Sequence, residues 1–188
     1  MRSPASTFAA VSVFVVFYLM TVFSLSWGTS ALGFSREEFL KLQMIGVLFF
    51  ALTIPLSAVL ADRFGRYPTL VVSNLLMIAF AFSFESLFSA GDASSTLLFL
   101  SIGLGLMGLG YGPLGTILSE LFPTAVRYTG SSLTFNLAGI FGASLAPYAA
   151  TWLATHHGIG SVGYYLAGAA VLALIALLLT GETRQRQD

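Results

Sequence analysis

The sequence predicts an all-α membrane protein with six transmembrane helices that form one half-bundle. Of its 188 residues, 56% are hydrophobic and only 9% are charged, whereas an ordinary soluble domain carries about 25% charged residues. The mean hydropathy of +0.88 points to the same class. The apolar stretches are continuous and do not alternate with polar residues, which argues against a transmembrane β-barrel.

Composition and charge exclude several classes of function. Eight basic and eight acidic residues give a formal net charge of +0, so no basic surface is expected to recruit nucleic acid. The chain has no cysteine, which excludes disulfides and thiolate metal sites. The adjacent His156 and His157 are too few for a metal site, and we expect neither a metal nor a cofactor. The partner that the composition indicates is the lipid bilayer.

The charged residues divide the chain into stretches that each accommodate a helix, because a bilayer core of about 30 Å requires about 20 apolar residues. The charge-free stretches are residues 3–35, 42–61, 67–84, 93–119 and 128–181. The last stretch is too long for one helix and is divided by the polar, Gly-rich run at 155–161. The loops are short, so residues 1–188 form a single domain. We predict helices near 7–28, 41–61, 68–89, 95–119, 129–154 and 161–181.

The basic residues predict the orientation. With six spans both termini lie on one side of the membrane, and the side richer in Lys and Arg faces the cytoplasm. The side of the termini carries Arg2, Arg63, Arg66, Arg127, Arg184 and Arg186. The opposite side carries only Arg36 and Lys41. We therefore expect a multi-pass protein of an inner (plasma) membrane with both termini in the cytoplasm.

Three clusters on the predicted cytoplasmic side each combine a carboxylate with a guanidinium group. They lie at 62–66, at 120–127 and at 182–184. Guanidinium groups bind carboxylates bidentately, so we expect a breakable latch between helix ends. For the cluster at 62–66 the alternative is a solvated turn that also orients the helices. The candidate gate or latch residues are Asp62, Arg63, Gly65, Arg66, Glu120, Arg127, Glu182 and Arg184.

These clusters resemble signatures of the major facilitator superfamily. Asp62-Arg63-Phe64-Gly65-Arg66 resembles its loop motif, with two departures: Ala58 stands where glycine is usual, and Tyr67 where a basic residue is usual. Residues 120–127, followed by Gly130, resemble the signature after the tenth helix of the sugar-porter-like branch. Residues 182–184 resemble the motif that closes the last helix, and residues 34–39 and 128–133 resemble the metabolite:proton symporter family.

The resemblance covers nearly the whole chain and implies helices seven to twelve of a twelve-helix transporter. It implies two inverted three-helix repeats here, and a missing amino-terminal six-helix half as partner. Two such halves rock about a central site and expose it alternately to the two sides of the membrane. The family implies small polar metabolites as substrates and protons as the coupling ion.

The predicted fourth helix carries a face of small residues, which favours close helix packing. Gly112-Pro113 should also kink this helix, because proline removes a backbone hydrogen bond. Packing is the first interpretation, and a gating hinge is the functional alternative. The candidate packing and hinge residues are Gly105, Gly108, Gly112, Pro113 and Gly115.

Polar side chains within the predicted helices are candidates for substrate binding, because polar groups in hydrocarbon face protein or water. The architecture that the resemblance implies places the first and second helices of each repeat around the cavity. Interhelical hydrogen bonding remains the alternative for each residue. The candidate substrate-binding residues are Tyr18, Thr21, Gln43, Tyr111 and Asn136.

The sequence thus predicts half of a secondary transporter rather than an enzyme, with organic acids as the expected substrate class. Glu85 lies close to the outer end of its helix, so we expect an interfacial carboxylate there and the coupling acid in the missing half. The alternative is a truncated or regulatory six-helix membrane protein without transport activity. An intramembrane enzyme is disfavoured, because no catalytic pair lies at membrane depth.

Overall fold

The computed structural model describes residues 5–120, 127–140 and 145–185. Side chains are described between residues 11 and 179, except 115–127, 134, 138 and 141–144. Every element in these ranges is helical, which confirms the predicted all-α class. The elements are α1 (Ala5–Tyr18), the π-helix η1 (Leu19–Phe23), α2 (Ser24–Ser30), α3 (Arg36–Phe64), α4 (Arg66–Ala81), the π-helix η2 (Phe84–Phe88), α5 (Ala93–Glu120), α6 (Arg127–Ile140), α7 (Ala146–His157) and α8 (Ile159–Gln185).

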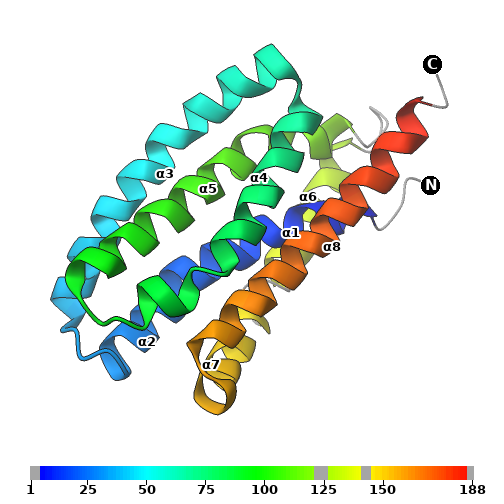
Figure 1. Ribbon diagram of the computed structural model, residues 1–188. Coiled ribbons are helices and arrows are strands. Elements are labelled where there is room, and N and C mark those ends of the chain that lie inside the picture. Colours follow the sequence, from blue (N-terminus) through cyan, green and yellow to red (C-terminus); the bar gives the residue numbers. More distant parts are fainter. Residues whose placement is uncertain (1–4, 121–126, 141–144, 186–188) are drawn as a thin grey trace.

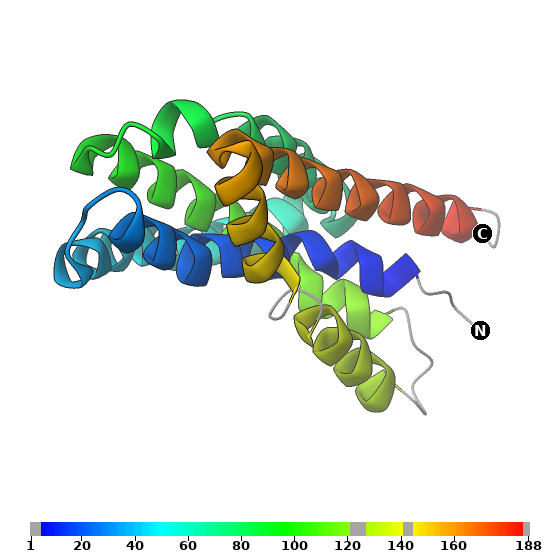
Figure 2. The same cartoon turned by 90° about the horizontal axis from the view of Figure 1, so that it is seen from below.

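The helices run back and forth between two ends of an elongated bundle (Figure 1). The start of α1, the α3–α4 connection and the end of α8 lie toward one end. The α2–α3 and α7–α8 connections lie toward the other. Figure 2 shows α1 between α8 and α6, and α1 contacts both helices. The α3–α4 connection and the two terminal helix ends therefore share one end of the molecule.

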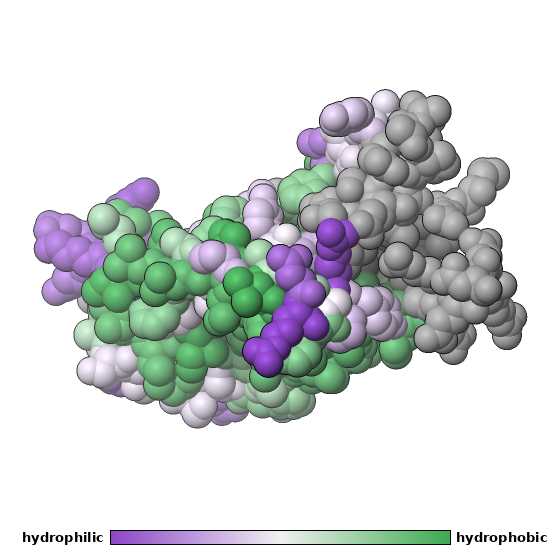
Figure 3. Space-filling view, turned by 90° about the horizontal axis from the view of Figure 1, so that it is seen from above, coloured by the Kyte–Doolittle hydropathy of each residue, from purple (hydrophilic) through white to green (hydrophobic). Residues whose placement is uncertain are grey.

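Within the described residues, four spans are long and apolar enough to cross a membrane. These are Val11–Ser30, Arg36–Phe64, Ala93–Leu114 and Ile159–Leu179. Hydrophobic residues cover much of the face in Figure 3, while hydrophilic residues concentrate at one end and in a second group farther along. A large apolar surface of this kind marks a membrane-embedded protein.

One predicted helix has different limits in the structure, and a second is described only on either side of a gap. The helix expected at 68–89 is interrupted: α4 ends at Ala81, and a turn at 82–83 leads into η2. Here the Ser83 hydroxyl donates to the Phe80 carbonyl oxygen at 2.7 Å, and such local bonds compete with helix continuation. The helix expected at 129–154 is found as α6 and α7, on either side of residues 141–144, which lie outside the described part of the chain. Pro147 lies in the first turn of α7, a position that proline favours because no helical partner is needed for its nitrogen.

Local sequence signals set the start and end of α3. Ser35 and Glu38 form a capping box: the Ser35 hydroxyl accepts from the Glu38 backbone N–H at 3.2 Å, and the Glu38 carboxylate accepts from the Ser35 N–H at 3.0 Å. At the other end Gly65 has φ +96°, which only glycine adopts readily. Pro68 then lies in the first turn of α4. The reversal between α3 and α4 is thus encoded in two residues, Gly65 of the predicted loop motif and Pro68 just after it.

Aromatic side chains form much of the core near the end that carries the α2–α3 connection. Phe88 and Phe99 stack with 4.6 Å between ring centroids and 8° between ring planes. Phe84 meets Phe99 edge-on at 4.7 Å, and Phe39 meets Phe88 edge-on at 6.4 Å. All four side chains are fully buried. Edge-on and offset contacts of this kind stabilise the packing beyond burial alone, so η2, α3 and α5 are held together here.

Candidate functional site

A π turn interrupts the first membrane-spanning segment between α1 and α2. The backbone N–H of Ser24 bonds to the Leu19 carbonyl, five residues back, instead of the Met20 carbonyl. The Met20 carbonyl therefore loses its normal helical donor. The Ser24 hydroxyl donates to it at 2.5 Å, and the side chain of Gln43 supplies a second donor from α3.

Gln43 connects α3 to this turn through its amide nitrogen. Gln43 Nε2 lies 2.9 Å from the carbonyl oxygens of Met20 and Thr21 and 3.2 Å from Ser24 Oγ. Unpaired backbone carbonyls are costly in a hydrocarbon environment, so these contacts stabilise the π geometry. The amide nitrogen of Gln43 thus makes interhelical hydrogen bonds, which were the alternative to substrate binding for this residue.

Tyr18 immediately precedes the same π turn, and Thr21 lies within it. Tyr18 is half-buried, and its ring meets that of Phe17 edge-on at 5.0 Å. The Thr21 hydroxyl donates to the Phe17 carbonyl at 2.6 Å. The structure therefore brings Thr21 and Gln43 together through the Thr21 backbone, with Tyr18 immediately before the turn.

Tyr111 lies on α5, where it meets rings from two other helices. Its ring centroid is 6.0 Å from that of Phe50 in α3 and 6.2 Å from that of Phe135 in α6. Phe135 also packs edge-on against Phe14 of α1 at 5.0 Å. These rings join α1, α3, α5 and α6. The Tyr111 side chain is 38% exposed, so it is accessible beside this aromatic group.

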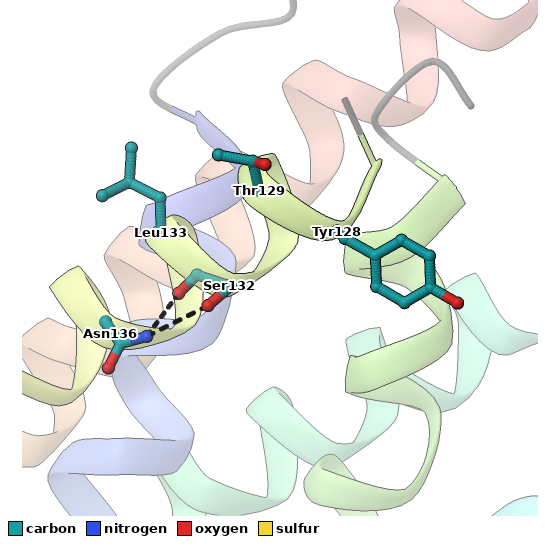
Figure 4. Close-up of a pocket in the computed structure, with 5 residues that line it drawn as sticks. All are labelled: Tyr128, Thr129, Ser132, Leu133 and Asn136. Atoms are coloured by element: carbon teal, nitrogen blue, oxygen red, sulfur yellow. Dashed lines mark hydrogen bonds between the residues drawn. The ribbon is translucent and has the colours of Figure 1, made fainter. Parts of the chain in front are cut away.

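Asn136 lines an open hollow on α6, shown in Figure 4. The hollow has a volume of about 700 Å³ and is lined by Tyr128, Thr129, Ser132, Leu133 and Asn136. Asn136 Nδ2 donates to the Ser132 carbonyl at 2.8 Å and approaches Ser132 Oγ at 3.3 Å. The dashed lines in Figure 4 show these bonds within one helix. Of the five candidate substrate residues, Asn136 alone lines this hollow, so the five do not converge on one described pocket.

The glycine face of α5 packs directly against α3. A side-chain carbon at Gly108 would overlap Thr53 Oγ1 and lie 2.7 Å from the Phe50 carbonyl oxygen. A carbon at Gly112 would overlap Ser57 Oγ. A carbon at Gly105 would have its nearest neighbour, Thr53 Cγ2, at 3.7 Å, which is an ordinary contact distance. Pro113 lies buried within α5. Two glycines therefore permit this close helix contact, while the side-chain surroundings of Gly115 lie outside the described residues.

The first predicted latch cluster lies in the α3–α4 connection. Asp62 and Arg63 are exposed, and these two side chains form no ion pair with each other. The Arg63 guanidinium carbon lies 5.4 Å from the centroid of the Phe64 ring, in cation–π range. Arg66 is half-buried at the start of α4, after Gly65. The side chains of Glu120, Arg127, Glu182 and Arg184 lie outside the described residues, so the remaining latch contacts stay predictions.

The end of α8 nevertheless lies beside the start of α4. Leu70 of α4 and Leu177 of α8 are buried together, with Tyr67 packed against them. Residues 182–184 follow Leu177 within α8. The first and third charged clusters are thus carried by helix ends that pack together.

The comparison with known families agrees with this arrangement of motifs and helices. A model of the Major Facilitator Superfamily matches residues 5–188. The chain belongs to the Major Facilitator Superfamily. The resemblance that the charged motifs indicated is confirmed.

Curated relatives of this Major Facilitator chain are named as transport proteins. It is 48% identical over 185 residues to the inner membrane metabolite transport protein YhjE of Escherichia coli (strain K12), covering 96% of this chain and 42% of the relative. It is 32% identical to the citrate-proton symporter of Klebsiella pneumoniae, covering 85% of this chain and 36% of the relative. It is 30% identical to the shikimate transporter of Escherichia coli (strain K12), covering 89% of this chain and 39% of the relative. The chain thus spans less than half the length of these relatives.

One buried polar contact of this Major Facilitator chain was missed from the sequence. The Ser12 hydroxyl of α1 donates to Asn74 Oδ1 of α4 at 2.8 Å, and Asn74 Nδ2 donates to the Leu70 carbonyl at 2.9 Å. Both residues are at most 1% exposed. The asparagine within an apolar helix was the available signal, since amides buried in membrane helices find partners on neighbouring helices.

The described residues contain no group of three or more His, Cys, Asp or Glu side chains that could hold a metal ion. His156 instead stacks on Trp152 with 4.8 Å between ring centroids, and its Nδ1 lies 2.9 Å from the Trp152 carbonyl oxygen. His157 also lies beside Trp152, at 5.5 Å. Both histidines are exposed at the end of α7, where they form part of an aromatic group.

Proposed function

We propose that this chain is the carboxy-terminal half of a secondary active transporter for small polar metabolites, with organic acids as the substrate class and protons as the coupling ion. The observation that carries the proposal is the match of residues 5–188 to the Major Facilitator Superfamily. Relatives named as a citrate-proton symporter and a shikimate transporter support the choice of organic acids. Coverage of only 36–42% of the relatives supports a second six-helix half as partner.

Transport by this protein would follow alternating access, in which two half-bundles rock about a site near the bilayer midplane. Discontinuous helices commonly contribute to such sites, because irregular backbone is tolerated where it meets a cavity or protein. The π turn at Leu19–Phe23 supports the assignment of Tyr18 and Thr21 as substrate contacts. Tyr111 and Asn136 would add a phenol and an amide to the same aqueous path, together with the remaining oxygen of Gln43.

Substrate recognition in this half would depend on neutral hydrogen-bonding groups. The membrane-spanning parts of α1 and α5 contain no Lys or Arg, so an organic anion would meet hydroxyl and amide groups here. Glu85 is exposed beside the outer connection that precedes α5, which supports placing the proton-coupling acid in the other half. The opposite charge needed by an anion would likewise come from that half.

The orientation proposed for the chain puts both termini and the three charged clusters in the cytoplasm. Arg63 and Arg66 support this orientation, because they lie at the end of the bundle that carries the start of α1 and the end of α8. Arg36 and Lys41 lie at the opposite end, at the start of α3. The name of one relative supports an inner membrane as the location.

The proposal can be tested with an epitope tag placed after Asp188 at the native locus. The expected result is a membrane protein of roughly 40 kDa or more, because a complete transporter of this type holds two such halves. Inside-out and right-side-out vesicles that contain it should accumulate labelled citrate or shikimate when a proton gradient is imposed, and a protonophore should abolish the uptake. A tagged protein near 20 kDa that supports no uptake would instead indicate a regulatory or truncated membrane protein.

A further inference from the structure

A narrow apolar groove lies where α3, α4 and α5 meet near the α3–α4 connection. It has a volume of about 190 Å³. Its lining includes Leu60 and Phe64 of α3, Pro68, Thr69 and Val72 of α4, and Leu109 of α5. The groove is separate from the hollow on α6, because the two share no lining residue.

The groove opens on a surface that needs an apolar environment. Only 17% of the most apolar window of the α3 span is buried inside the protein. Val59, Phe64 and Val72 are 62%, 62% and 53% exposed. Besides α3, helix α4 packs against α5 and α8. An exposed apolar surface on a membrane-spanning segment is covered by lipid acyl chains.

A positive charge lies at the end of this groove. The Arg63 guanidinium carbon is 5.4 Å from the centroid of the Phe64 ring, and that ring lines the groove. The apolar span ends at Phe64, so Arg63 lies at the depth of lipid headgroups. Arg63 is exposed, and among the described side chains it forms no ion pair. Arg66 adds a second positive charge just beyond Gly65, and Asp62 subtracts one.

We propose that this groove binds an anionic phospholipid, with an acyl chain beside Leu60, Val72 and Leu109 and the phosphate at Arg63. A guanidinium group donates two parallel hydrogen bonds to a phosphate, which gives both affinity and orientation. The groove supplies the apolar half of the recognition and Arg63 the polar half, so a single lipid satisfies both. Such a lipid would bridge α3 and α4 at their connection. The inference does not depend on which metabolite is transported.

Photolabelling of the full-length protein that contains this chain tests the proposal. The protein is reconstituted into phosphatidylcholine vesicles that contain a small fraction of a probe lipid with a diazirine on one acyl chain. The probe is phosphatidylglycerol in one preparation and phosphatidylcholine in the other. Peptide mass spectrometry then locates the labelled residues. We expect labelling around Leu60, Val72 and Leu109, stronger with the phosphatidylglycerol probe by about fivefold, the factor that corresponds to one surface charge.

Three variants separate the headgroup contribution from the groove. Arg63→Gln should remove the preference for phosphatidylglycerol, whereas Arg63→Lys should retain most of it. Val72→Trp should fill the groove and suppress labelling by both probes. The matched control is Leu48→Trp, because Leu48 is a 62% exposed residue of α3 that does not line the groove; this variant should be labelled like the unmodified protein.

Several outcomes would overturn the proposal. Equal labelling by the two probes, or a preference that survives Arg63→Gln, would show that Arg63 does not recognise the headgroup. Groove residues that remain unlabelled in the full-length protein would show that protein covers them. The Arg63 variants alter an exposed side chain only, so they keep the test decisive even if Val72→Trp fails to fold.

Discussion

The side-chain amide nitrogen of Gln43 in α3 lies 2.9 Å from the backbone carbonyl oxygen of Met20 in the π turn of the first span. The π turn redirects the Ser24 N–H to Leu19 and leaves the Met20 carbonyl to other donors. The π-helical turn in one span thus depends on a side chain of the next.

We expect Gln43→Met to destabilise the π turn, because the carbonyls of Met20 and Thr21 would lose their interhelical donor. The free energy of unfolding should fall by about 1–2 kcal/mol, the range for interhelical hydrogen bonds in membranes. Hydrogen–deuterium exchange of the peptide around residues 19–24 should increase. Gln43→Glu should be more damaging, because it replaces the donor with an acceptor.

The control for this prediction is Met44→Leu, which alters the neighbouring, 70% exposed residue and should leave the exchange unchanged. Exchange around residues 19–24 that is the same in Gln43→Met as in the unmodified protein would contradict the role of Gln43.

A graded series of glycine substitutions on α5 should follow the space available against α3. Gly108→Ala should be most destabilising, because the backbone carbonyl of Phe50 cannot yield as a side chain can. Gly112→Ala should cost less and Gly105→Ala least, with an overall range of about 1–3 kcal/mol for the crowded positions. Thermal unfolding in detergent measures the order. Gly168→Ala is the matched control, since no atom lies within 4 Å of the added carbon; a series without this order would refute the close-packing account.

Stability should depend on pH through Asp92, which precedes α5. Hydrogen bonds from Ser95, that of its backbone N–H first among them, lower the pKa of the Asp92 carboxyl. Because the folded-state pKa is lowered, the Asp92 carboxylate stabilises the folded protein fully above the ordinary aspartate pKa of about 3.9. This stabilisation is lost as the pH falls through the lower folded-state pKa. The difference in melting temperature between the unmodified protein and Asp92→Ala should therefore narrow in acid.

Asp92→Asn serves as the control for this pH dependence. This variant keeps an oxygen acceptor for the Ser95 N–H but cannot titrate. The difference in melting temperature between Asp92→Asn and Asp92→Ala should therefore vary little with pH. If the difference in melting temperature between the unmodified protein and Asp92→Ala stays constant in acid, Asp92 is not a source of pH-dependent stability.

Charge reversal in the predicted latch should impair transport by the full-length protein without preventing its insertion. Asp62→Arg or Arg127→Glu would replace attraction between helix ends with repulsion and shift the balance of open and closed states. Initial uptake should fall by about tenfold, within the usual range of conformational coupling energies. Membrane fractionation checks insertion, and Arg36→Glu at the opposite end of the bundle is the control. Normal uptake by both latch variants would count against the latch.

Much of the fold could be predicted from the sequence because its signals are local. Charge-free stretches of sufficient length specify membrane helices wherever they fold. Ser35 and Glu38 specify a helix start, and Gly65 with Pro68 specifies a reversal, because each acts within a few residues of backbone. The charged loop motifs were likewise sufficient to indicate the Major Facilitator Superfamily.

The site could be predicted only in part, because residue type does not reveal the partner. Gln43 and Asn136 are both polar residues in apolar helices, yet the amide of Gln43 reaches across to the π turn η1 while that of Asn136 stays within α6. The Ser12–Asn74 contact spans 62 residues of sequence and leaves no local pattern.

The sequence by itself determined the membrane class, the helical fold and the family, because these depend on composition, on run length and on short motifs. Only the tertiary structure decided the π turn at Leu19–Phe23 with its donor Gln43, and the close contact of Gly108 with Thr53. The physical reason is that a carbonyl left without its helical donor, or a glycine without a side chain, acquires its role from the helix that packs against it.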